Sequence, residues 1–244
     1  MDLVRVLING SDGRMGQESV KAISEDPELD LVAQTDLHDN LTKIILDIKA
    51  QVVLDFTNAD VVMEVSLSII KSGARPVIGT SGLLPKQVAE LKKLCKKQKI
   101  GGIIAPNFAI GAVLMMKFSQ DAAKYLPQAE LIELHHDGKK DSPSGTAIKT
   151  ANLIAEARTN YSKTHTEKEV LVGSRGANAE GVRIHSVRLP GLVAHQEVIF
   201  GGQSQTLSIR HDSIHRKSFM PGVCLACKKV MDLNELIYGL EHLL

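Results

Sequence analysis

The first hundred residues alternate short, mainly apolar segments with longer segments of helical periodicity, and this alternation constrains the fold most. Residues 3–8, 52–56 and 102–105 are runs of strand length that are apolar except for Arg5 and Asp55, and 85–98 is one of the helical stretches between them. Strands that are apolar on both faces need cover on both faces, which intervening helices supply. The sequence therefore predicts an α/β domain, a Rossmann-like doubly wound parallel sheet. The other strands expected in it are 29–34 and 76–78, and the other helices are 14–24, 41–49 and 59–70, the last ending at Gly73.

The pattern changes after Asn107 and predicts a second domain. Three segments alternate apolar and polar residues with period two, as half-buried strands do: 183–188, 193–200 and 206–211. Antiparallel neighbours, and hence an α+β domain with one open sheet face, are expected. The other elements expected are helices at 113–126 and 144–158, the latter with Ser142 as its cap and Pro143 in its first turn, a strand at 130–135, and a helical tail over 218–243.

Composition argues against several classes of partner. The chain has 244 residues and a net charge of +1, which gives no bulk attraction to nucleic acid or to an anionic membrane. Aromatic residues make up 3% and Trp is absent, so base-stacking surfaces are not expected. No apolar run approaches the ~20 residues of a membrane span. Three cysteines and an N-terminus without signal-peptide features favour a reducing, cytoplasmic setting.

A glycine-rich turn follows the first expected strand and opens the first expected helix. Gly10, Gly13 and Gly16 are spaced G-x-x-G-x-x-G, a variant of the dinucleotide-binding pattern. Such glycines let the backbone approach a pyrophosphate at a helix N-terminus. Asp36 lies about 20 residues further on, where an acidic side chain accepts hydrogen bonds from an adenosine ribose. A ligand-free strand-to-helix turn is the alternative, and the spacing of Asp36 favours a dinucleotide.

Two later turns fit the same site. Residues 79–82 follow the fourth expected strand, and 105–108 follow the fifth. Ligands of open parallel sheets gather beyond the carboxyl ends of strands, so both turns are candidates to line a nicotinamide, although each alone also fits a plain loop.

A second cluster of functional side chains lies at residues 133–146. His135, His136 and Lys139 precede a Ser-Pro-Ser-Gly-Thr helix start. Cations facing a helix N-terminus suit a small dicarboxylate, and a His or Lys there can deliver a proton. A metal site is the rival interpretation, but adjacent His residues on a strand point to opposite faces and no third ligand has suggestive spacing, so no metal is expected. A capped helix after a polar loop is the plain alternative.

Together these segments resemble the 4-hydroxy-tetrahydrodipicolinate reductase (dihydrodipicolinate reductase) family of lysine biosynthesis. The matching segments are 10–16, 55–57, 79–82, 105–111, 133–147 and 188–201. The resemblance implies NADH- or NADPH-dependent reduction of 4-hydroxy-tetrahydrodipicolinate, a small cyclic dicarboxylate, to tetrahydrodipicolinate with loss of water, in the diaminopimelate pathway. It also implies a dinucleotide-binding domain (1–106 and 217–244), a substrate-binding and oligomerisation domain with an open mixed sheet (107–216), and a homotetramer.

The resemblance assigns roles to individual residues. The catalytic positions are His135 and Lys139, and the substrate-binding positions are His136, Gly145 and Thr146. The cofactor-binding positions are Gly10, Ser11, Asp12, Gly13, Arg14, Met15, Asp36, Gly79, Thr80, Ser81, Ala105, Pro106, Asn107 and Phe108.

Some features depart from the family or stand outside it. Leu37 occupies a position where some members carry an Arg, which weakens the grip on a 2′-phosphate; Arg14 remains a candidate for it, so NADH and NADPH both stay open. Cys224 and Cys227 form a C-x-x-C in an expected helix and are interpreted as buried small hydrophobes. The lysine-rich stretch 92–99 is expected to be a solvated helix face. Another dehydrogenase of amino-acid metabolism and a non-catalytic dinucleotide sensor are the alternative functions.

Overall fold

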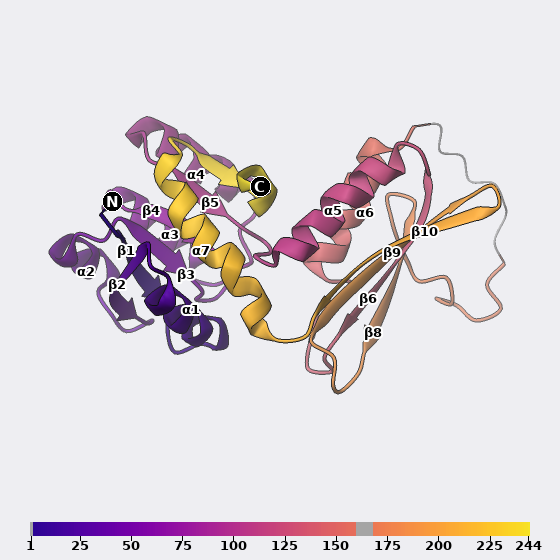
Figure 1. The fold of residues 1–244 in the computed structure, drawn as a ribbon, viewed down its shortest axis with the longest axis horizontal. Helices are drawn as coiled ribbons and strands as arrows, with labels where there is room; N and C mark the ends of the chain where they lie inside the picture. Colours follow the sequence, from indigo (N-terminus) through magenta and orange to yellow (C-terminus); the bar gives the residue numbers. More distant parts are fainter. Residues whose placement is uncertain (1, 160–167) are drawn as a thin grey trace. The chain divides into compact units, whose positions relative to one another are not determined.

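The computed structural model describes residues 2–159 and 168–244, which form two compact units. The first unit comprises Met1–Ile110 and Arg216–Leu244, and the second comprises Gly111–His215 (Figure 1). No helix within the described ranges is long and apolar enough to cross a membrane.

The first unit is built on a parallel sheet. Its strands, in the order in which they lie side by side, are β11 (Leu236–Tyr238), β5 (Gly102–Ile104), β4 (Arg75–Ile78), β3 (Val52–Asp55), β1 (Val4–Asn9) and β2 (Leu29–Thr35). The helices are α1 (Arg14–Glu25), α2 (Leu41–Ile48), α3 (Val62–Lys71), α4 (Pro85–Gln98) and α7 (Met220–Lys229). The strand order reverses between β1 and β3, so the crevice for a ligand lies beyond the carboxyl ends of these two strands. The predicted doubly wound sheet is confirmed.

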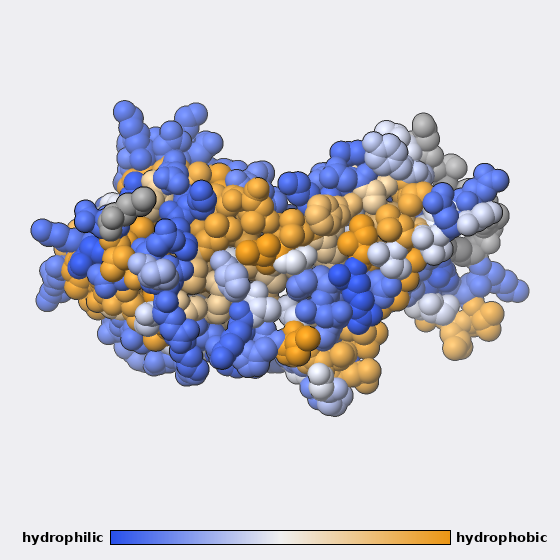
Figure 2. Space-filling model, viewed as in Figure 1, coloured by the Kyte–Doolittle hydropathy of each residue, from blue (hydrophilic) through white to orange (hydrophobic). Residues whose placement is uncertain are grey.

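Burial explains why the central strands carry apolar residues on both faces. Leu7 and Val53 pack with α2, α3 and α4 in one apolar cluster, and their neighbours Val6 and Val52 are also fully buried. On α4 the polar side is solvated: Figure 2 shows hydrophilic side chains along its outer surface, where the lysines at 92, 93, 96 and 97 are exposed.

The second unit is a mixed sheet with helices on one face. Its strands, in spatial order, are β10 (Gln205–Ser213), β9 (Ala194–Gly202), β6 (Gln128–His135), β8 (Val182–Arg188) and β7 (Ala177–Ala179). α5 (Ile110–Ala123) and α6 (Gly145–Ala157) lie along one side of this sheet, against Leu131, Ile184 and Val198 (Figure 1). The open face was expected. β6 and β8 are parallel, whereas β9 pairs antiparallel with both β6 and β10.

The prediction of a helical tail is wrong beyond Lys229. After α7 the chain makes a 3₁₀ turn (Val230–Asp232), then pairs through β11 with β5, and ends in another 3₁₀ turn (Leu240–Leu243). The leucine spacing fits a helix, but the edge of β5 offers unpaired backbone groups that Leu236–Tyr238 satisfy as a strand. Tertiary pairing therefore overrides the local period.

The predicted cap of the second unit's α6 is also wrong. Ser144, not Ser142, is the N-cap: its backbone is extended and its side chain accepts the Ala147 N–H at 3.1 Å. The helix begins at Gly145, so Ser142 is too far upstream to reach the first free amides, and Pro143 precedes the helix instead of opening it.

Candidate functional site

The glycine turn after β1 has the shape that a dinucleotide phosphate requires. Gly10 has a φ of +83°, and a Cβ there would lie 2.7 Å from the Phe56 carbonyl oxygen. A Cβ on Gly16 would lie 2.1 Å from the Gly10 carbonyl oxygen, so α1 packs directly on the turn. Gly13 is the N-cap, and no side chain among the described residues caps α1. The first amides of the helix are therefore open to an anion, which fits a pyrophosphate.

Asp36 follows the end of β2 and joins it to this turn. Its Oδ2 accepts the Asp12 N–H at 3.2 Å, and its Oδ1 accepts the Leu37 N–H at 2.8 Å. A cavity of about 460 Å³ lies beside Asp36, in the size range of small-molecule sites. Asn9, Leu37, Asp39, Glu64 and Ser68 are among its lining residues. Asp36 thus lies between the glycine turn and this cavity.

The turns after β4 and β5 are brought together by two aromatic rings. Phe56 and Phe108 pack edge to face, with centroids 5.7 Å apart and an interplanar angle of 67°. A Cβ on Gly79 would lie 2.1 Å from the Phe56 ring and 2.9 Å from the Phe108 ring. Gly79 is therefore the residue that lets both turns close on this ring pair. In the second turn Pro106 is exposed, and Asn107 accepts the Ala109 N–H at 2.8 Å.

Asp55 is a site residue to which the sequence alone gave no role. It is fully buried at the end of β3 and accepts hydrogen bonds from Asn9 Nδ2 at 2.9 Å, Thr57 Oγ1 at 3.0 Å and Thr80 Oγ1 at 2.6 Å. Burial raises the pKa of Asp55, and these hydrogen bonds oppose that rise. Asp55 ties together the ends of β1, β3 and β4, and the predicted nicotinamide turn at 79–82 begins at the end of β4. A carboxylate that ends a wholly apolar strand was the available signal.

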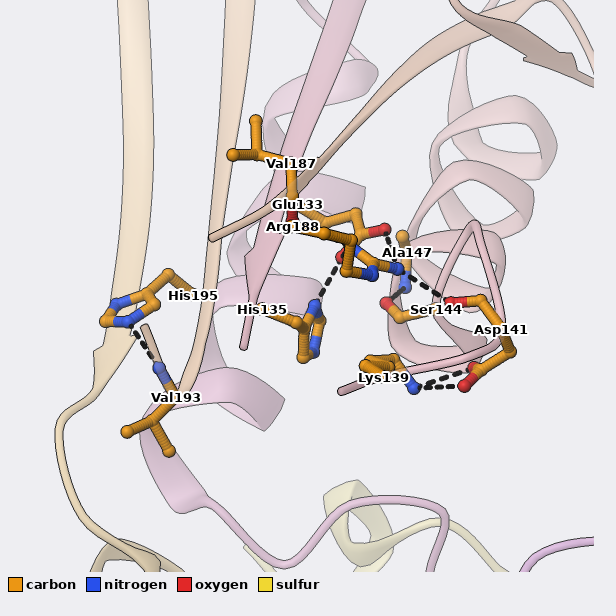
Figure 3. Close-up of polar contacts among 10 residues, drawn as sticks. All are labelled: Glu133, His135, Lys139, Asp141, Ser144, Ala147, Val187, Arg188, Val193 and His195. Atoms are coloured by element: carbon orange, nitrogen blue, oxygen red, sulfur yellow. Dashed lines mark hydrogen bonds and ion pairs between the residues drawn. The ribbon is translucent and has the colours of Figure 1, made fainter. Parts of the chain in front are cut away.

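The second unit holds the predicted proton donors (Figure 3). His135 is the last residue of β6, and its Nδ1 makes a short hydrogen bond to the Glu133 carboxylate. His136 follows directly, and its carbonyl accepts the Lys139 N–H at 3.1 Å. Lys139 Nζ contacts both carboxylate oxygens of Asp141 at 2.7 Å, and this ammonium lowers the pKa of Asp141. All three predicted cationic residues thus come from one strand end and the turn after it.

Gly145 and Thr146 are the first two residues of α6. Gly145 is exposed, and a Cβ there would meet nothing within 4 Å, so the space above the helix N-terminus is open. The turn that carries Lys139 leads directly into this N-terminus, with Ser144 as its cap. The segment therefore combines cationic side chains with helix amides, the two groups that bind carboxylates best.

Glu133 and Arg188 were not predicted as site residues. Glu133 is fully buried, and Arg188 from β8 donates to it from Nη2 at 2.8 Å and from Nη1 at 3.0 Å. Burial would raise the pKa of Glu133, but hydrogen bonds from His135, Arg188 and Ser186 outweigh it and hold the pKa at about 2. The signal was present in the sequence: period two places Glu133 on the same face as Leu131, and a buried carboxylate needs a cation.

The cysteines and potential metal ligands add no further site. Cys224 and Cys227 lie on α7 as free thiols, and burial raises the pKa of both, that of Cys224 to about 11. Within residues 2–159 and 168–244, no three His, Cys, Asp or Glu side chains are grouped closely enough to hold a metal ion.

Comparison with known proteins covers the whole chain. The model of the dihydrodipicolinate reductase N-terminus matches residues 4–108, and the model of its C-terminus matches 111–244. A 4-hydroxy-tetrahydrodipicolinate reductase of Legionella pneumophila is 52% identical over 240 residues, 98% of this chain and 99% of that protein. One from Streptococcus pneumoniae is 50% identical over 253 residues, 99% of each chain.

The solved structures agree. The structure of a dipicolinate-bound dihydrodipicolinate reductase from Paenisporosarcina sp. TG-14 has a TM-score of 0.90 and 45% identity, covering 99% of this chain and 100% of that one. A probable dehydrogenase from Thermotoga maritima, at 13% identity and a TM-score of 0.67 over 98% of this chain and 92% of its own, shares the fold alone. With two family models spanning the chain and relatives half identical along its length, this protein belongs to the dihydrodipicolinate reductase family.

Proposed function

We propose that the turn between β6 and α6 is where this chain carries out its family's reaction, the NADH- or NADPH-dependent reduction of 4-hydroxy-tetrahydrodipicolinate to tetrahydrodipicolinate with loss of water. The observation that carries the proposal is the position of His135, His136 and Lys139, on one short segment that leads into the N-terminus of α6. This segment offers positive charge and the N-terminal end of a helix dipole to a small cyclic dicarboxylate. The relative from Paenisporosarcina, with dipicolinate bound, supports a ligand of this class.

The first unit is proposed to hold the coenzyme. Residues 10–15 would bind the pyrophosphate, Asp36 the adenosine ribose, and the turns at 79–81 and 105–108 would flank the nicotinamide. The open N-terminus of α1, the positive φ of Gly10 and the cavity beside Asp36 support this assignment. When bound, the coenzyme supplies the hydride. The corresponding domains are 1–106 with 217–244 for the coenzyme and 107–216 for the substrate and for oligomerisation.

The chain's own residues orient the substrate and supply a proton. His136, Gly145 and Thr146 are assigned to the two carboxylates, which fixes the ring relative to the protein. Reduction with loss of water leaves an electron-rich, enamine-type carbon that must be protonated. Lys139 or His135 is the general acid: both side chains can carry a transferable proton, and both lie beside the proposed carboxylate site.

A homotetramer and a cytoplasmic location complete the proposal. The face of the second sheet opposite α5 and α6 carries Ile132, Leu134, Val187 and Ile199, all partly exposed. Glu130, His185 and Glu197 share this face with them. Exposed apolar side chains on a sheet face without a covering layer favour burial against another copy of the chain. The three free cysteines favour a reducing compartment.

Steady-state kinetics test the site. Lys139→Ala and His135→Ala are each expected to lower kcat about 100-fold or more, the usual contribution of a general acid. Lys140→Ala, which removes the exposed neighbouring cation, is the matched control and is expected to keep near-normal turnover. Circular dichroism checks the fold of each variant. The assignment is wrong if both site variants turn over normally, and coenzyme binding without oxidation by the cyclic dicarboxylate would indicate a sensor instead.

A further inference from the structure

We infer that Glu133 and Arg188 are positioning residues for this reaction: Glu133 fixes the tautomer of His135, and Arg188 fastens the Lys139 turn to the sheet. The inference rests on the proposed function, because it concerns the groups assigned there to proton transfer. It assigns a role to two charged side chains that lie mostly away from solvent. Figure 3 shows both between His135 and Asp141.

Glu133 and Arg188 form an ion pair whose charges balance each other. Glu133 is fully buried, and the Arg188 side chain is 18% exposed. The two terminal nitrogens of Arg188 meet the two carboxylate oxygens at 2.8 and 3.0 Å, a bidentate pair. A carboxylate with a dedicated arginine remains ionised without a second cation. His135 is therefore not required as the counter-ion of this carboxylate.

This contact selects one tautomer of His135. An ionised carboxylate only accepts hydrogen bonds, so the Nδ1 atom that faces Glu133 must carry the hydrogen. Nε2 is then the nitrogen left for exchange with a ligand, and it lies on the side of the ring away from Glu133 (Figure 3). Solvated imidazoles prefer hydrogen on Nε2, so the preference of His135 is imposed by Glu133.

Arg188 also connects two segments that carry the proposed acid groups. Nη2 donates to the Asp141 carbonyl oxygen at 2.7 Å, and Nη1 donates to the Val187 carbonyl oxygen at 2.8 Å. The Asp141 side chain in turn holds Lys139. One guanidinium thus joins the end of β6, where His135 lies, to the turn that carries the ammonium.

These contacts also exclude Arg188 as a binding residue for a substrate carboxylate. With two hydrogens on each terminal nitrogen, the four hydrogen bonds to Glu133, Val187 and Asp141 occupy every donor at that end of the guanidinium. Both terminal nitrogens of Arg188 therefore donate only to protein groups, and a different cation must bind the substrate carboxylates.

The test uses the full-length protein and two readouts. The double variant Glu133→Met/Arg188→Met replaces the buried pair by apolar side chains of similar length, which leaves no uncompensated charge. In the ligand-free protein, ¹⁵N chemical shifts of the His135 ring, assigned with His135→Gln, are expected to show Nδ1–H in the natural chain and mainly Nε2–H in the double variant. We expect kcat to fall at least about 10-fold while the KM for the coenzyme stays within about 2-fold.

Two further variants test separate points: one distinguishes the role of Arg188 from that of Glu133, and the other measures the general effect of altered packing. Arg188→Lys keeps a cation beside Glu133 but cannot make four hydrogen bonds, so it is expected to keep the tautomer and still lower kcat. Gln196→Met is the matched control: Gln196 pairs with Glu133 in strand register on the same buried face and bonds Thr150, away from the site. Both readouts should be unchanged in it.

The inference is overturned if the ¹⁵N pattern of the double variant matches that of the natural chain. It is also overturned if kcat of the double variant stays within about 2-fold of the natural chain. The same holds if Gln196→Met changes both readouts as much as the double variant does. Its failure is distinguishable from that of the proposed function, because the NMR measurement needs neither substrate nor coenzyme. Normal turnover in both Lys139→Ala and His135→Ala refutes the proposed site itself.

Discussion

Glu133 shows how a single buried charge is kept ionised. Three side chains donate to its carboxylate, and the pKa of about 2 lies well below the usual value of 4.5. A carboxyl group whose pKa is lowered on folding stabilises the folded state wherever it is ionised in both states. Its contribution is therefore fully present above pH 4.5, and it is lost as the pH falls toward about 2.

Acid unfolding measures this contribution. The difference of about 2.5 pH units corresponds to about 3 kcal/mol of unfolding free energy. We expect the stability of the natural chain to fall more steeply between pH 4.5 and 2 than that of Glu133→Met/Arg188→Met, measured by urea unfolding at each pH. Lowered carboxyls with other partners, such as Glu130, are common to both proteins. Asp141 differs only through its weaker interaction with Arg188, because Lys139 is the main cause of its lowered pKa, so most of the difference comes from Glu133. Parallel stability curves would contradict this account.

Leu37 is the residue that bears most on the choice of coenzyme. Its side chain is 54% exposed and lines the cavity beside Asp36, together with the acidic Asp39 and Glu64. Negative charge on these side chains disfavours an additional phosphate. We therefore expect NADH to bind more tightly than NADPH.

Introducing a cation at this position tests the explanation. Leu37→Arg is expected to raise the affinity for NADPH about 10-fold, because a guanidinium binds phosphate through two hydrogen bonds, and to leave the affinity for NADH nearly unchanged. Isothermal titration calorimetry of both coenzymes gives the ratio, with Leu37→Met as the control for altered shape. If the ratio of NADPH to NADH affinity is unchanged in Leu37→Arg, the 2′-phosphate of NADPH does not bind beside residue 37.

At the scale of elements, the contact of α1 with the turn after β1 determines the shape of the proposed coenzyme site. The helix packs so closely on the turn that only glycine fits at position 16. The same turn is held to β2 through Asp36, so a displacement of α1 shifts the proposed ribose contact as well. Binding is therefore sensitive to this one helix–turn contact.

Gly16→Ala tests that sensitivity. Its Cβ would lie 2.1 Å from the Gly10 carbonyl oxygen, so the backbone must move, and we expect at least a 10-fold loss of NADH affinity, about 1.4 kcal/mol. Gly13→Ala is the comparison: its Cβ would lie 3.4 Å from the same oxygen and its φ is −69°, so a much smaller loss is expected. Calorimetry gives both values, and equal losses would contradict the packing argument.

At the scale of the whole molecule, the sheets of the two units differ in how helices cover them. In the first unit helices shield both faces of the parallel sheet, whereas in the second α5 and α6 cover one face only. The other face keeps partly exposed apolar residues from β6, β8 and β9. This difference is why we assign assembly to the second unit.

A charge on the open face tests the proposed tetramer. Ile199→Glu is expected to yield smaller species than the natural chain at the same protein concentration, because burying an unpaired carboxylate at an interface is costly. Light scattering after size-exclusion chromatography gives the masses, and circular dichroism confirms the fold. Tyr125→Glu, at a side chain that is 84% exposed, should leave the mass unchanged. A natural chain that is itself monomeric contradicts the assignment.

Most of the fold could be predicted from the sequence, because apolar periodicity and turn residues determine helices, strands and turns over only a few neighbouring residues. The period of apolar residues predicted α4 over the residues it occupies, and predicted β1 to within one residue at each end. Glycine spacing located the turn at Gly10, since only local backbone geometry requires a positive φ there. Charged side chains next to a helix start located the candidate dicarboxylate site in the same way.

Only the tertiary structure decided the features that depend on residues far apart in the chain. β11 forms because β5 presents an open edge to it, and no local pattern near Leu236 encodes that edge. Glu133 and Arg188 are 55 residues apart and meet because β6 and β8 run parallel side by side. Periodicity and turn chemistry are properties of neighbours in sequence. Edge pairing and buried ion pairs arise only after folding has made distant segments neighbours in space.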